Sequence, residues 1–125
     1  MMLIAMLAAT ATCQAAPGGA SETQHAQVAR SFMTLVSQRR IDEAAKLVEP
    51  DADYVDVYGD DTMSIEAALD QALEDREQAT LTYLDRVGDP NTIAIKSRVR
   101  DADGAEDQIT VFKMGGGCIT GIYQF

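Results

Sequence analysis

The chain has 125 residues, which fits a single domain, and 46% of them are hydrophobic, an ordinary content for a globular protein. Twenty acidic residues against ten basic ones give a formal net charge of −10. An acidic surface repels phosphate groups, so this charge argues against nucleic acid as a partner and against anionic membrane surfaces. It also disfavours highly anionic substrates, unless Arg or Lys gathers locally.

The first 16 residues are apolar, rich in alanine and uncharged. They resemble a short secretory signal peptide with small-residue cleavage sites, although no basic residue precedes them. We expect residues 1–16 to be this signal, 17–22 a linker and 23–125 the folded domain, so that the protein is periplasmic or secreted. The alternative is a mis-chosen start codon upstream of a cytoplasmic domain. A bilayer span takes about 20 apolar residues, so no stable membrane insertion is expected.

Cysteine and histidine are scarce. Removal of residues 1–16 would take Cys13 and leave Cys118 alone, so no internal disulfide is expected and Cys118 is interpreted as an inert strand residue. His25, the only histidine, is predicted on an exposed helical turn and is given no role. The acidic run at 101–106 lacks a full calcium-ligand set and is better explained as a hairpin turn. We therefore expect no metal and no cofactor.

Three helices are predicted in the first 80 residues. Ser21 and Gln24 form a capping-box pattern before an amphipathic helix that ends near 38–40. Asp42 is placed as the cap of a short second helix, which Pro50 ends. Ser64 is placed as the cap of a third helix that frays by residue 78.

Strands account for the rest. One early strand is predicted at 52–58, followed by a turn at 59–61. Four consecutive strands are predicted at 80–87, 93–100, 108–114 and 118–125, separated by turn signals. This order predicts an α+β fold, with a strongly curved antiparallel sheet wrapped around the N-terminal helices.

The most informative stretch is the early strand. Side chains of a strand alternate between faces, so Tyr54, Asp56 and Tyr58 should share one face while Val55 and Val57 share the other. A carboxylate between two phenols is typical of an acid–base or polar-ligand site rather than of a plain core strand. A register slip of one residue would instead point Asp56 outward.

Several motifs, in order along residues 25–125, carry a family resemblance. These are Arg40 to Leu47, Glu49 to Asp56 with its Pro-Asp-Ala entry, Ser64 to Ala68, and the closing Gly117 to Tyr123. Their order and spacing resemble the SnoaL-like group of the nuclear-transport-factor-2-like superfamily. The resemblance implies a cone-shaped sheet with an apolar pocket. That superfamily includes ketosteroid isomerases, dehydratases, cyclases and epoxide hydrolases, beside many domains without a reaction, so the fold does not decide the function.

The resemblance also assigns candidate roles. Asp56 falls where ketosteroid isomerase carries its general base, and an apolar pocket would raise the pKa of such a carboxyl. The positions of the two oxyanion donors correspond to Phe32 and Thr110. Phe32 cannot donate a hydrogen bond and Thr110 is a weak replacement, which argues against steroid isomerisation.

Alternation and helical phase add further candidates for the pocket wall, each of which is also compatible with plain core packing. They are Phe32, Leu35, Val36, Met63, Leu69, Thr110, Phe112 and Met114.

Three functions remain open at the level of the sequence. The first is a domain that holds a small apolar or aromatic molecule in its conical cavity. The second is an acid–base isomerase, dehydratase or cyclase that uses Asp56 with Tyr54 or Tyr58. The third is a homodimeric assembly domain, although Lys96, Arg98 and Arg100 charge one face of the sheet.

Overall fold

A computed structural model of the chain describes residues 10–74 and 80–125, which form three helices and six strands. None of the helices in these two ranges is long and apolar enough to cross a membrane. The elements are α1 (Glu22–Ser37), α2 (Ile41–Ala45), β1 (Val48–Asp56), β2 (Asp61–Ser64), α3 (Ile65–Glu74), β3 (Thr80–Asp89), β4 (Thr92–Asp101), β5 (Gly104–Gly115) and β6 (Cys118–Gln124).

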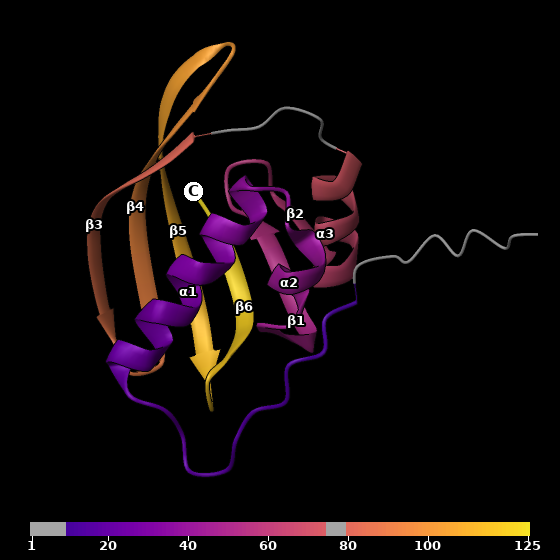
Figure 1. The fold of residues 1–125 in the computed structure, drawn as a ribbon, viewed down its shortest axis with the longest axis vertical. Helices are drawn as coiled ribbons and strands as arrows, with labels where there is room; N and C mark the ends of the chain where they lie inside the picture. The colour runs from indigo at the N-terminus through magenta and orange to yellow at the C-terminus, as the bar shows by residue number, and fades with distance from the viewer. Residues whose placement is uncertain (1–9, 75–79) are drawn as a thin grey trace, which may run out of the picture.

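The six strands form one curved, open sheet in the order β2-β1-β6-β5-β4-β3. All neighbours are antiparallel except β1 and β6, which run parallel and bring the first and last strands together. Helix α1 lies across the inner face, while α2 and α3 lie near β1 (Figure 1). The predicted α+β class is confirmed, with β2 and β3 left as edges.

Two of the three predicted helix caps are confirmed. Ser21 forms the capping box with Gln24, and the Oγ of Ser64 accepts a hydrogen bond from the Ala67 N–H at 3.2 Å. The third is wrong: α2 begins at Ile41, so Asp42 lies inside its first turn and Arg40 occupies the cap position without a side-chain bond. The predicted end of the third helix near residue 78 lies outside the described residues.

Strand β1 begins earlier and ends earlier than predicted. It runs from Val48 to Asp56, and its pairing with β6 shifts register between Val48 and Asp53. Pro50 lies within that irregularity, where a missing N–H interrupts no regular ladder. The turn lies at 57–60 rather than at the predicted 59–61, and Asp61 already begins β2, a short edge strand that the sequence analysis did not predict.

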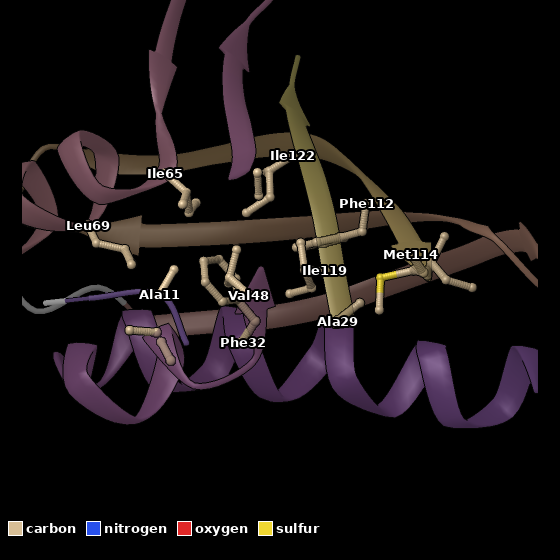
Figure 2. Packing of buried hydrophobic residues seen from close by; sticks show 14 of the residues in the cluster. Ala11, Ala29, Phe32, Val48, Ile65, Leu69, Phe112, Met114, Ile119 and Ile122 are labelled. Atoms are coloured by element: carbon tan, nitrogen blue, oxygen red, sulfur yellow. The ribbon is translucent and has the colours of Figure 1, made fainter. Parts of the chain in front are cut away.

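The core lies between the helices and the inner face of the sheet. Figure 2 shows Ala29 and Phe32 of α1 directed toward Phe112, Ile119 and Ile122 of the sheet. The rings of Phe32 and Phe112 meet edge to face, with centroids 6.0 Å apart. Burial of such side chains stabilises the fold by roughly 1.5–3 kcal/mol each.

His25 is fully buried, in contrast to the predicted exposed position. Its Nδ1 donates to the carbonyl oxygen of Pro90, and its Nε2 accepts from the Gly117 N–H at 3.0 Å. One imidazole thereby connects α1 to the β3–β4 turn and to the β5–β6 turn. The error arose because the sequence pattern did not show that two turns cover this end of α1.

The N-terminal segment is attached to the fold by a disulfide between Cys13 and Cys118. Main-chain hydrogen bonds join Thr12 to Ala45 at 3.2 Å and Cys13 to Val48 at 2.9 Å, and Ala11 is buried. The expectations of no internal disulfide and of an inert Cys118 are therefore wrong. Processing of residues 1–16 stays a prediction, but cleavage after Ala16 would remove all these contacts.

Candidate functional site

A cavity of about 390 Å³ opens between α1, α3 and the inner face of the sheet. Apolar side chains form most of its wall, and a few polar groups lie among them. An adjoining space of about 310 Å³ shares part of this wall and extends along α3. The main cavity is lined by Phe32, Met33, Val36, Ser37, Arg39, Tyr54, Ala72, Leu81, Val99, Gln108, Thr110, Ile122 and Gln124.

The structure places half of the predicted pocket residues at this wall. Phe32, Val36 and Thr110 line the main cavity, and Leu69 lines the adjoining space. Tyr54, predicted for a catalytic role, lines both. The side chains that the sequence patterns selected on α1, β1, α3 and β5 thus lie around one pair of adjoining spaces. Their contact with a ligand stays a prediction.

The other four predicted pocket residues lie elsewhere. Phe112 and Met114 are buried under α1 as core residues, since they lie farther along β5 than Thr110. Leu35 contacts the core from the side and borders a surface hollow with Arg30. Met63 belongs to the edge strand β2 and borders neither space. These positions are corrections to the predicted wall.

Three polar side chains on β5 and β6 form a hydrogen-bonded chain in the cavity wall. The Oγ1 of Thr110 donates to the Oε1 of Gln124 at 2.8 Å. The Nε2 of Gln124 in turn donates to the Oε1 of Gln108 at 3.4 Å. The hydroxyl proton of Thr110 is thus occupied within the protein, which strengthens the argument against an oxyanion donor at this position.

Tyr54 supplies a phenol to the wall. Burial raises its pKa above the ordinary value of 10.0, and the negative charge of Asp56 raises it further. The phenol is therefore neutral near pH 7 and keeps a proton to donate to a ligand oxygen.

Asp56 lies at the very end of β1 and is partly exposed. Its Oδ1 accepts a hydrogen bond from the Gly59 N–H at 3.1 Å, which closes the turn that leads into β2. Asp56 borders neither of the two spaces that Tyr54 lines. Its carboxylate thus has a structural partner and acts on Tyr54 through its charge.

Tyr58 does not join the predicted Tyr-Asp-Tyr face. The strand stops at Asp56, so Tyr58 falls in the following turn, where 83% of its surface is exposed. Its ring meets that of Phe125 edge to face at 6.3 Å. The predicted strand, and with it the alternation of side chains, extended two residues past the observed end of β1. The turn after Asp56 interrupts the pleat that would have aligned the three side chains.

Arg39 lines the cavity, and the sequence reading missed it. It follows α1, where the pattern predicted only a helix end. Its Nη2 donates to the carbonyl oxygen of Leu73 at 2.9 Å, while its Nη1 is buried and has no hydrogen-bond partner in the part of the chain that the structure describes. No local sequence signal distinguishes Arg39 from the adjacent Arg40. Arg40 lies on the surface in an ion pair with Glu43.

Within residues 10–74 and 80–125, no group of three or more His, Cys, Asp or Glu side chains is arranged to hold a metal ion. The polar groups in the cavity wall are a phenol, two amides, hydroxyls and a guanidinium. These groups can orient an apolar molecule that carries a polar end.

Comparison with solved structures identifies the fold. A candidate ketosteroid isomerase from Kribbella flavida matches 82% of this chain and 77% of its own, with a TM-score of 0.76 and 18% identity. A nuclear-transport-factor-2-like protein of unknown function from Burkholderia xenovorans matches 86% and 85%, with a TM-score of 0.76 and 8% identity. An LEH-like epoxide hydrolase from M. tuberculosis matches 82% and 81%, with a TM-score of 0.67 and 14% identity.

No protein-family model and no curated protein matches the sequence. The matching solved structures include several nuclear-transport-factor-2-like proteins and a designed protein with a curved β-sheet, and the chain shares their cone-shaped fold. At identities below 20% the likeness establishes the fold alone, since one fold hosts many functions.

Proposed function

We propose that the protein is a binding domain that holds a small apolar or aromatic molecule in the cavity between α1, α3 and the sheet. The proposal is supported by the composition of the cavity wall, which is mostly apolar with a few polar groups. Phe32, Val36 and Ile122 present apolar surface, while Tyr54 and the Gln108–Gln124 pair provide polar groups. A volume of about 390 Å³ lies at the lower end of the range of small-ligand pockets, roughly 300–1,000 Å³.

A thermal-shift screen with small aromatic and branched apolar compounds tests this proposal. Ligands that bind the folded state alone raise its melting temperature, and the shift grows with the logarithm of the ligand concentration above Kd. Substitution Ala72→Phe should fill the cavity and remove the shift, because Ala72 lines both spaces. Ala67→Phe is the matched control, since Ala67 is exposed on the same helix. Absence of any shift across the screen would contradict the proposal.

A second candidate function is acid–base catalysis by Asp56 and Tyr54, as an isomerase, dehydratase or cyclase. The influence of the Asp56 charge on the pKa of the Tyr54 phenol supports it, since the two groups must lie near one another. The turn contact of Asp56 and the exposure of Tyr58 rank it below binding. In an assay of proton transfer on any ligand found, Asp56→Asn should abolish turnover, and unchanged turnover would exclude this role.

A third candidate is assembly of two copies through the outer face of the sheet. Register pairs Val55 with Tyr123, Tyr123 with Val111, Val111 with Ala94 and Ala94 with Val87, so these side chains form an apolar row across five strands. We propose this row, rather than the charged Lys96 side of the face, as the contact in a homodimer. Light scattering after size exclusion tests it, and a mass of one 13.5 kDa chain at micromolar concentration would refute it.

For localisation, we propose an oxidising compartment, either the periplasm or the cell exterior. The Cys13–Cys118 disulfide supports this, because structural disulfides persist mainly outside the reducing cytosol. The buried Ala11 further supports a leader cleavage site that leaves both Ala11 and Cys13 in the mature chain, rather than one after Ala16. Intact mass of the exported protein, with and without reduction and alkylation, tests both points. An N-terminus at residue 17, or two free thiols, would contradict them.

A further inference from the structure

Among the described residues that line the cavity, Arg39 is the one with a cationic side chain, and its backbone conformation is unfavourable. Its φ angle of 61° lies in the left-handed region, which side chains with a Cβ rarely adopt. The N–H of Arg39 bonds to Val36 O at 3.0 Å and that of Arg40 to Leu35 O at 2.8 Å. This is the Schellman pattern that ends many helices, and glycine is the usual residue at the position of Arg39.

An arginine with a left-handed backbone persists where contacts of its side chain offset the conformational cost. One such contact is the hydrogen bond from its Nη2 to the carbonyl oxygen of Leu73, which joins the end of α1 to α3. The Nη1 of the same guanidinium is buried and has no hydrogen-bond partner among the described residues, and Arg39 is one of the residues that line the cavity. The three ion pairs found among the described residues involve Arg40, Arg86 and Arg98, and none involves Arg39.

A buried guanidinium nitrogen without a partner is unfavourable, whereas the fork of the guanidinium is matched to a carboxylate. The cavity beside it offers apolar surface from Met33, Leu81 and Val99. The polar amides of Gln108 and Gln124 are already bonded to each other. The cavity thus contains one site for an anionic group and a larger region for an apolar body.

The net charge of the chain limits the ligand further. At −10 the protein repels polyanions at long range, so a single negative charge on a small ligand is favoured over a phosphate-rich one. We propose that the cavity selects small monocarboxylates with an aromatic or branched apolar body, whose carboxylate accepts hydrogen bonds from Arg39. This inference rests on the binding function proposed above and specifies its ligand class.

Calorimetric titration of the full chain tests the inference with matched probes. Benzoate, 3-phenylpropanoate and indole-3-acetate are each compared with their primary amide, which has a similar shape and no charge. We expect the carboxylate of at least one pair to bind roughly tenfold or more tightly than its amide, as a charge-assisted hydrogen bond allows. In Arg39→Gln this preference should disappear, while Arg40→Gln should retain it, because Arg40 pairs with Glu43 on the surface.

A second variant separates binding from folding. Arg39→Gly relieves the left-handed backbone, so the fold should be retained even though the bond to Leu73 is lost. Loss of carboxylate preference in this variant, with its melting temperature near that of the parent, supports the inference. Equal affinities for acid and amide, or a preference that survives in Arg39→Gln, would overturn it while leaving apolar binding intact. Absence of binding by acids and amides alike would overturn it together with the binding function.

Discussion

Cys13 and Cys118 are 105 residues apart in sequence, yet their Cα atoms lie 5.9 Å apart and their sulfurs are bonded. The bond fixes the N-terminal segment to the first residue of β6, beside the parallel β1–β6 pair. The segment thereby becomes part of the domain, and Ala11 contributes to the core.

Loss of this bond should destabilise the protein strongly. Closing a loop of about 100 residues restricts the unfolded chain enough to contribute roughly 4–5 kcal/mol in the chain-entropy model. We expect Cys13→Ser with Cys118→Ser to lower the free energy of unfolding by about 3–5 kcal/mol in urea titrations. Reductant should weaken the parent protein and leave the double variant unchanged. Equal stability of the parent with and without reductant would refute this role.

His25 should contribute to stability through its two hydrogen bonds to the main chain. The variant His25→Leu keeps the volume but leaves the carbonyl of Pro90 and the N–H of Gly117 without their partner. Loss of these two part-buried hydrogen bonds costs about 1–3 kcal/mol together, which should appear as a lower unfolding midpoint in urea. Gln27→Leu, at an exposed position of the same helix, should change stability by about 0.5 kcal/mol or less.

The hydrogen bond between Asp56 and the turn predicts that two substitutions of Asp56 differ in stability. A purely catalytic role of Asp56 would not predict this difference. Asp56→Ala removes the acceptor of the Gly59 N–H, whereas Asp56→Asn keeps an oxygen at that position. We expect Asp56→Ala to lose about 1 kcal/mol of folding free energy and Asp56→Asn to lose clearly less. Thermal unfolding followed by circular dichroism measures both, and identical losses would show that the contact contributes nothing.

The raised pKa of Tyr54 predicts a loss of stability at alkaline pH. Its pKa in the folded state is raised above 10.0 by burial and by Asp56, so the folded protein retains a proton that the unfolded chain releases. The associated stability is present below pH 10 and is lost as the pH rises through the folded-state pKa. Urea unfolding at several pH values from 8 to about 11.5 should therefore show a steeper decline for the parent than for Tyr54→Phe.

Tyr58→Phe serves as the matched control, because it removes an exposed phenol from the adjoining turn. Its stability should fall with pH in parallel with the parent. Parallel curves for the parent and Tyr54→Phe would instead show that the Tyr54 phenol does not stabilise the fold through its protonation.

The sequence by itself determined the three helices, five of the six strands and their order, while the edge strand β2 was not predicted. The Ser21 capping box, the Ser64 cap and the alternation in 93–100 depend on neighbours within four residues, so they can be recognised without a tertiary structure. The ordered motifs then indicated the cone fold, which the solved structures confirm.

Tertiary structure alone decided the partners of the chemically important side chains. The burial of His25 depends on turns 65 and 92 residues away, and the disulfide depends on a strand 105 residues away. The end of β1 at Asp56 separated Tyr58 from the cavity, and the path of the chain after α1 placed Arg39 in its wall. Local periodicity carries no information on such contacts, because packing between distant segments sets which groups meet and which donor is left unpaired.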